Sequence, residues 1–331
     1  MDLIVEMAGA ALRPLIEIAG IASAKAYWLY LLCALLLALL VYVRRAEAPS
    51  LSGALRYLFP KRLYTHVSAI ADYKIWFANA FLFALGLLPT LAGAGALAAE
   101  AVGGALASLF GAGGLGWTAD WRGQVAFTLC QLLAIDAAFF VAHYLQHRVP
   151  LLWEFHKVHH SAEVLVPVTV FRMHPVDLML HFLLVGLFAG AVLGAFSYAY
   201  AAPVAAFAVN GLNLGLFLFY VAGVHLRHSH VWLMYPGWFG RHLSSPALHQ
   251  IHHSSARQHA DKNLGQIFTI WDRLAGTLYL PEREERLQYG LWEGEHAEFR
   301  TLRALYFRPF LKAARLIRLS APGGRRESSG T

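Results

Sequence analysis

The sequence has little charge and almost no cysteine. Of its 331 residues, 58% are hydrophobic and only 14% are charged, whereas a soluble domain usually carries about 25% charge. This shortage predicts an integral membrane protein. Cysteine occurs only at Cys33 and Cys130, both in apolar stretches, which excludes a disulfide framework, a thiolate zinc site and an iron–sulfur cluster. Residues 1–24 lack the basic start and apolar core of a cleavable signal peptide, and we expect an interfacial helix there.

The formal net charge of +7 could indicate either nucleic-acid binding or a membrane surface. The basic residues are interleaved with uncharged stretches and do not form a separate basic domain. This arrangement fits the cytoplasmic ends of membrane spans, close to anionic lipid. We therefore expect a membrane and a lipid as partners, and no nucleic acid.

Uncharged stretches predict the spans. Residues 26–43 end at Arg44 and Arg45, which marks a cytoplasmic end. A second stretch, 75–99, is expected to return outward. Residues 101–117 are so rich in glycine that we predict an outer loop or a re-entrant piece, and a third span over 123–142 returns to the cytoplasmic side.

The longest stretch without Asp, Glu, Lys or Arg runs from Leu178 to Leu226. It is long enough for two spans of about 20 residues, joined by a turn near 197–203. Both of its ends would then face the cytoplasm. Further along the chain, residues 300–318 alternate Arg and Lys with large apolar side chains, which predicts a basic amphipathic helix lying on the membrane.

The predicted fold is an all-α integral membrane helical bundle of about 4–5 spans with a cytoplasmic histidine-rich helical cap. We expect an N-terminal membrane region over 1–122, a catalytic region over 123–281, and a C-terminal amphipathic helix with a disordered tail over 282–331. Short loops and abundant Ala, Leu and Gly favour a bacterial inner membrane, with the endoplasmic reticulum as the alternative.

Three clusters of histidine form the most informative pattern. Their spacings are HxxxH, HxxHH and HxxHH, and residues three or four apart share one face of a helix, so each cluster would present its imidazoles along one edge. Imidazole is the commonest metal ligand. The clusters comprise His143 and His147; His156, His159 and His160; and His249, His252 and His253.

Many imidazoles with almost no carboxylate indicate a borderline transition metal, not calcium or magnesium. They are also too many for one zinc ion, which takes four ligands, so two ions are predicted. Iron suits the membrane setting, because an N-rich pair of irons can bind dioxygen and attack an unactivated C–H bond of a lipid. We expect no catalytic side chain beyond the metal centre.

The three clusters, with FRMHP, HSH and DKNLGQIFTIWDRLAGTLY, resemble the fatty acid hydroxylase/sterol desaturase superfamily over about Asp136–Tyr279. The resemblance implies a non-haem di-iron membrane oxygenase that receives electrons from a separate redox protein, cytochrome b5-like or ferredoxin-like. It also implies that the eight clustered histidines are metal ligands. The family adds one or two more after the long uncharged stretch, where His225 and His228 are the candidates.

Three further residues are expected to support the ligands. Asp136 precedes His143 by two helical turns, and we hypothesise that it accepts a hydrogen bond from a liganding histidine. Asp272 could do the same, or cap a helix and pair with Arg273. His174 precedes a proline and is expected to have either a structural role or a ligand's role.

Two activities fit these residues best. The leading hypothesis is a lipid mono-oxygenase that inserts oxygen into a C–H bond, and a lipid desaturase is the nearest alternative. A di-zinc membrane hydrolase and a non-catalytic scaffold are the alternatives from other classes. The scaffold is disfavoured because all three clusters are complete.

Overall fold

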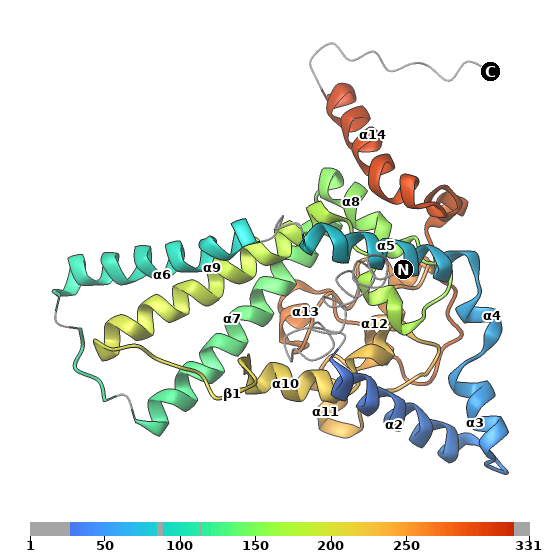
Figure 1. Ribbon diagram of the computed structural model, residues 1–331, viewed down its shortest axis with the longest axis horizontal. Helices are drawn as coiled ribbons and strands as arrows, with labels where there is room; N and C mark the ends of the chain where they lie inside the picture. The colour runs from blue at the N-terminus through green and yellow to red at the C-terminus, as the bar shows by residue number, and fades with distance from the viewer. Residues whose placement is uncertain (1–26, 85–88, 113, 119, 321–331) are drawn as a thin grey trace, which may run out of the picture.

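The computed structural model describes residues 27–84, 89–112, 114–118 and 120–320, which are mostly helical (Figure 1). The prediction of an interfacial helix over 1–24 therefore lies outside the described residues. In chain order the helices and strands, with η for a 3-10 helix, are α2 Trp28–Arg45, α3 Leu51–Leu58, α4 Lys61–Tyr64, α5 Val67–Ala84, α6 Pro89–Phe110, α7 Trp121–Arg148, α8 Pro150–His160, η1 Pro167–Phe171, α9 Pro175–Tyr200, β1 Ala208–Val209, β2 Leu212–Asn213, α10 Leu214–Val221, η2 Val224–His228, α11 Gly237–His242, α12 Pro246–His252, η3 Arg257–His259, α13 Ile270–Ala275, η4 Trp292–Phe299 and α14 Leu302–Ser320.

Four of the described helices are long and apolar enough to cross a membrane, and we treat the chain as an integral membrane protein. They are Trp28–Arg45, Gly93–Phe110, Trp121–Arg148 and Pro175–Tyr200. The first and third agree with the predicted spans over 26–43 and 123–142. The second differs, because the apolar window lies at 93–110 and not at 75–99.

Glycine explains why α6 continues where a loop was predicted. Helices α6 and α9 lie side by side (Figure 1), and at Gly190 and Gly194 of α9 a Cβ atom would collide with the backbone of Gly95 and Ala99 of α6. Small residues let two membrane helices approach this closely. The glycines of residues 101–110 therefore belong to a packed helix, and the prediction of a loop or re-entrant piece was wrong for them.

The long uncharged stretch holds one long helix, α9, and not two. After α9 the chain forms a two-residue antiparallel pair, β1 with β2, and then the short helix α10. Asn210 and Gly211 adopt φ of 48° and 80° between the strands, the left-handed conformation that a tight hairpin turn requires. Asn213 then caps α10 by accepting a bond from Gly215 N at 2.9 Å. The polar residues of this turn interrupt the apolar stretch, so the second of the two spans predicted there does not form.

The ends of α7 and α9 nearest the histidines are surrounded by short elements. A buried ion pair between Arg172 and Asp72, 2.7 Å long, ties the segment before α9 to α5. Helix α14 confirms the helix predicted over 300–318, and its Leu305 packs with Ile75 and Val158. Contact between α14 and a membrane remains a prediction.

Candidate metal centre

Three helix termini bring the clustered histidines together. Helix α7 carries His143 and His147 near its end, and Pro150 then begins α8, which carries the second cluster. Pro246 begins α12, in the first helical position that proline favours, and α12 leads into the third cluster. Ser245 does not cap α12 with its side chain, because its hydroxyl donates to the Met234 sulfur at 3.0 Å.

The candidate ligands form two groups, within each of which the ligand atoms lie no more than 4.8 Å apart. The five-histidine group takes members from all three clusters, and the four-histidine group includes one residue from η2. The five-histidine group is His143, His147, His156, His160 and His252, and the four-histidine group is His159, His228, His249 and His253.

In the five-histidine group four of the five outer ring nitrogens have partners. The Nδ1 atoms of His143 and His252 lie 2.8 and 2.9 Å from the carbonyl oxygens of Leu264 and Lys262. Two more Nδ1 atoms face carboxylates, His156 with Asp177 at 3.0 Å and His147 with Asp261 at 3.1 Å. Such partners fix the tautomer with Nδ1 protonated, which leaves the Nε2 lone pair for a metal.

The Nε2 atoms of all five rings are buried and lack a hydrogen-bond partner among the described residues. A buried polar atom without a partner is costly, and five such atoms in one place call for a bound ligand or ion. Because the outer nitrogens already hold the rings, a shared ion would satisfy the inner ones. The five-histidine group therefore fits a metal.

The four-histidine group is more tightly convergent. The Nε2 atoms of His228, His249 and His253 lie 3.1 Å from one another, and that of His159 lies 3.2 Å from His228 Nε2. A ring nitrogen either donates its proton or accepts with its lone pair and cannot do both, so hydrogen bonds alone cannot hold a triangle of this kind. Ligands at about 2.1 Å from a common ion are about 3.0–3.4 Å apart, and this group therefore also fits a metal.

Burial keeps these imidazoles neutral. Desolvation lowers the pKa of His252 to about 3 and holds the pKa values of His159, His160, His249 and His253 well below the usual value for histidine. Neighbouring imidazoles act in the same direction. The lowered pKa values of these five rings favour the uncharged form, which is the form that binds a metal ion.

The three candidate histidines outside the clusters lie in different environments. His228 joins the four-histidine group, whereas His225 is in neither group, although it is buried. His174 caps α9, since its Nδ1 accepts from Val176 N at 3.1 Å and its Nε2 lies 3.1 Å from Tyr306 O. Of the two roles predicted for His174, the structure supports the structural one.

Asp136 does not contact a histidine, and the hypothesis that it supports a ligand directly was wrong. Its carboxylate accepts from the backbone N–H groups of Ile267 and Phe268 at 2.7 and 3.0 Å, and from Trp271 Nε1 at 2.7 Å. Three donors from one segment satisfy both oxygens of this buried carboxylate. Asp136 therefore anchors the segment that leads into α13.

Asp272 also acts on the backbone, not on a histidine or on Arg273. It accepts from Leu264 N and Gly265 N, both at 2.8 Å, and from the Thr277 hydroxyl at 2.6 Å. Arg273 instead donates to the Arg241 carbonyl at 2.8 Å. Since Leu264 O faces His143, Asp272 supports that ligand through the loop.

The carboxylates that do meet candidate ligands, Asp177 and Asp261, were not singled out from the sequence. Asp177 lies in the first turn of α9, where it also accepts from Gln146. Asp261 belongs to the ADKNLG stretch of the third resemblance motif. A carboxylate just after a His-Pro helix start, and another in a loop after a histidine cluster, were the available signals.

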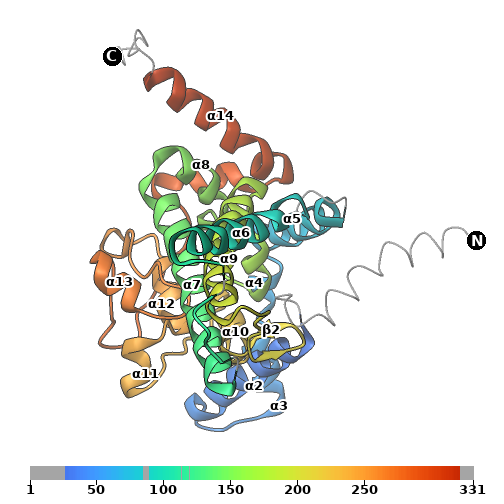
Figure 2. The same cartoon turned by 90° about the vertical axis from the view of Figure 1, so that its left-hand side faces the viewer.

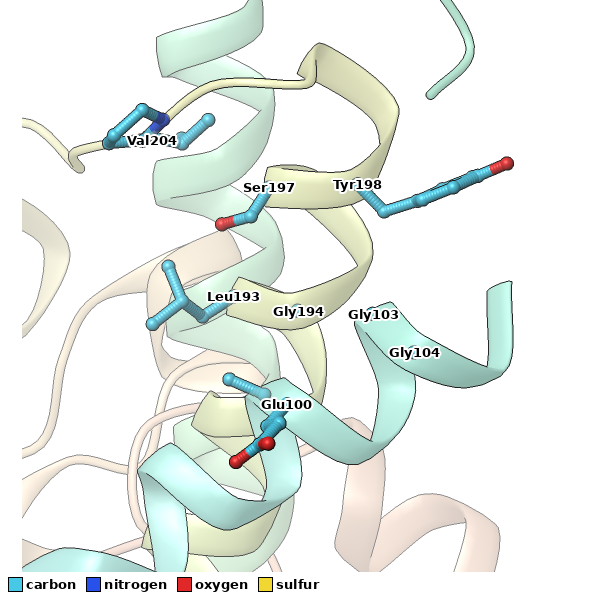
Figure 3. Close-up of a pocket in the computed structure, with 10 residues that line it drawn as sticks. Glu100, Gly103, Gly104, Leu193, Gly194, Ser197, Tyr198 and Val204 are labelled. Carbon is cyan, nitrogen blue, oxygen red and sulfur yellow. The ribbon is translucent and has the colours of Figure 1, made fainter. Parts of the chain in front are cut away.

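A cavity of about 620 Å³ lies elsewhere, between α6 and α9 (Figure 3). Glu100, Gly103, Gly194 and Ser197 line it, near the end of α9 that is remote from the histidine clusters. It is therefore separate from the candidate metal centre.

Residues 128–277 match the family model described as fatty acid hydroxylase. These residues, just under half of the chain, form a fatty acid hydroxylase region. This superfamily region contains every member of both histidine groups. No solved structure matches the chain.

Relatives in the superfamily are lipid hydroxylases or monooxygenases. Ornithine lipid hydroxylase OlsE of Rhizobium tropici is 28% identical over 178 residues, which is 53% of this chain and 48% of that protein. Human alkylglycerol monooxygenase is 26% identical over 188 residues, 54% of this chain and 34% of that protein. Human cholesterol 25-hydroxylase is 31% identical over 155 residues, 44% of this chain and 49% of that protein. The chain thus spans half or less of the length of these relatives.

Proposed function

We propose that this protein is a membrane-bound non-haem di-iron oxygenase that hydroxylates a C–H bond of a lipid. The convergence of nine histidines, seven buried and two half-buried, into two groups that are each suited to one ion carries the proposal. One oxygen atom of O2 would enter the lipid and the other would leave as water, with two electrons and two protons consumed. The electrons would come from a partner redox protein, cytochrome b5-like or ferredoxin-like.

Iron is the metal that best fits both the imidazole ligands and the activities named for the relatives. Imidazole suits zinc, copper, nickel and iron alike, but the named relatives are hydroxylases and monooxygenases. Bound iron would supply the activation of O2. A lipid desaturase would use the same ions and remove two hydrogens, whereas a di-zinc hydrolase would need neither O2 nor a reductant.

The chain's own residues hold the ligands and exclude water. Asp177, Asp261 and the carbonyls of Lys262 and Leu264 orient four imidazoles of the five-histidine group from behind. The Arg172 carbonyl, 3.2 Å from His159 Nδ1, does the same in the four-histidine group. No side chain beyond the metal ligands is assigned a proton-transfer role.

We place the site on the cytoplasmic side. Arg45, at the basic end of α2, pairs with Glu284 at 2.7 Å, and Arg148, at the end of α7, pairs with Asp261 at 3.3 Å. Basic helix ends that share a side with the histidines support this orientation by the positive-inside rule. An electron donor with an acidic surface would suit these basic ends, and a bacterial inner membrane is the proposed location.

The substrate class is a polar lipid modified close to its head group. The relatives' names mention an ornithine lipid, alkylglycerols and cholesterol, so their shared chemistry is hydroxylation of an amphiphile. The candidate ligands at the end of α7 would lie where a head group meets the water boundary. The particular lipid and carbon are left to product analysis.

The test is the metal content of the purified protein beside a His156→Ala/His159→Ala variant, which disables one ligand in each group. We expect about two irons per chain, with at most one weakly held iron left in the variant, and a lipid product one oxygen atom heavier when reductant and O2 are supplied. A product lighter by two hydrogens would identify a desaturase. Failure to bind iron after reconstitution would contradict the proposal, and zinc-dependent lipid hydrolysis would replace it.

A further inference from the structure

Two short helices outside the metal centre expose an unusual amount of apolar surface. Trp238 and Phe239 of α11 are 63% and 56% exposed, and Ile270 and Leu274 of α13 are 45% and 75% exposed. We call these four residues the α11–α13 patch. The helices form one unit, because Thr269 donates from its N–H to His242 O at 3.0 Å and from its hydroxyl to Arg241 O at 2.6 Å.

The patch lies alongside a membrane span, not beyond its end. The segment entering α13 donates three hydrogen bonds to Asp136 of α7. Asp136 is seven residues before His143, which places it about 10 Å further from the histidine end of the helix. Ile267 of this segment also packs against Leu132 of α7 and Leu216 of α10. Figure 2 shows α11 and α13 together on one side of α7.

The patch is continuous with the lipid-facing surface of that span. Leu129 and Leu133 of α7 are 54% and 44% exposed. They precede Asp136 by seven and three residues, so they share its face of the helix. Lipid chains that cover Leu129 and Leu133 would therefore meet the α13 segment directly above them.

We propose that the α11–α13 patch is immersed in the bilayer, at the boundary between head groups and acyl chains. Tryptophan favours this zone, and arginine there meets lipid phosphates. Arg241 and Arg273, both exposed, lie on the same two helices as the patch. On this proposal α11 and α13 belong to the bilayer boundary and not to the cytoplasmic cap predicted for this region.

Immersion in the membrane explains why the Asp136 carboxylate accepts hydrogen bonds from backbone N–H groups. Backbone N–H groups at membrane depth need an acceptor within the protein, because lipid supplies none. The Asp136 carboxylate supplies it to Ile267 and Phe268. The patch also lies close to the five-histidine group, since Asp272 of α13 holds Leu264, whose carbonyl faces His143.

The test places one nitroxide label on the full-length protein in phosphatidylcholine/phosphatidylglycerol vesicles. Cys33 and Cys130 are first changed to alanine, and a cysteine then replaces Leu274 or, in a second variant, Ile270. Accessibility to O2, which concentrates in lipid, is compared with accessibility to a water-soluble nickel chelate. Leu129→Cys is the lipid-facing control, and Arg257→Cys, exposed on η3, is the aqueous control.

We expect the label at position 274 to resemble the one at 129, with at least a several-fold higher ratio of O2 to nickel accessibility than at 257. A label that resembles the one at 257 would overturn the proposal. A label that neither reagent reaches would also overturn it, by indicating a second copy or another protein on the patch. The result does not depend on bound metal, so it stands apart from the proposed oxygenase activity.

Discussion

The two histidine groups differ in what lies behind them. Two carboxylates and two carbonyls face the outer nitrogens of the five-histidine group. In the four-histidine group the outer nitrogen of His159 faces a carbonyl, and among the described residues no carboxylate bonds His159, His249 or His253. The first group therefore combines more ligands with more negative charge.

This difference predicts that the two groups bind their ions with different affinity. A carboxylate behind an imidazole makes the ring a stronger donor and favours the higher charge state of its metal. An ion held by four imidazoles keeps more positions for outside molecules than one held by five. We therefore expect the five-histidine group to bind its ion more tightly and the four-histidine group to be more open to exchange.

The largest effects should come from removing ligands, and they should be unequal. His249→Ala leaves three imidazoles in one group, whereas His160→Ala leaves four in the other. In the His249→Ala variant we expect the four-histidine group to lose its ion. Its affinity should fall by more than the roughly 10–100-fold seen when an outer partner of a ligand is removed. His160→Ala should retain weak binding. Metal titration of both variants measures this, and equal losses would remove the distinction between the groups.

Much of the site could be predicted from the sequence because helical spacing dictates which imidazoles share an edge. The eight clustered histidines and His228 all joined a group, but the division between groups could not be predicted. His159 and His160 are adjacent in α8 yet belong to different groups. Adjacent helical residues point about 100° apart, and only the tertiary arrangement of α7, α8, η2 and α12 decides which ring meets which partner.

The supporting residues were harder to predict for a related reason. Asp136 and Asp272 looked like partners of histidines, but both bind backbone N–H groups of the same loop region. The contacts of a carboxylate depend on loops that sequence periodicity does not describe. Prediction of the fold had a similar limit. Hydropathy located three of the four candidate spans, but it could not reveal that Asn210 and Gly211 turn the chain within an apolar stretch.

Asp177→Asn should produce the next largest effect. Asp177 is fully buried and serves His156, and Gln146 also donates to it. Loss of its charge should weaken the ion of the five-histidine group by on the order of 10–100-fold and spare the other ion. Metal content after dialysis should fall toward one ion per chain. Asp120→Asn, at the far cap of α7, is the matched control and should keep both.

Asp272→Asn should have a smaller effect that passes through the loop. An amide replaces one acceptor oxygen with a donor that faces the N–H of Leu264 or Gly265, at a cost of about 1–3 kcal/mol in stability. The carbonyl of Leu264 would then hold His143 less firmly. We expect a lower midpoint in thermal unfolding and a several-fold weaker ion in the five-histidine group. Unchanged unfolding with two firmly bound ions would mean that the loop does not depend on Asp272.

Asp261→Asn should give the smallest and cleanest effect. Asp261 adopts φ of 54°, a left-handed conformation that asparagine tolerates, so the loop should keep its shape. Its side chain is 38% exposed and its pair with Arg148 lies at the surface, so that pair contributes little to stability. What changes is the charge behind His147. We expect unfolding to be unaffected and the ion of the five-histidine group to weaken by about 10-fold, as measured by competition with a chelator. If affinity is unchanged while Asp177→Asn still reduces it, the advantage of the five-histidine group rests on one buried carboxylate and not on two.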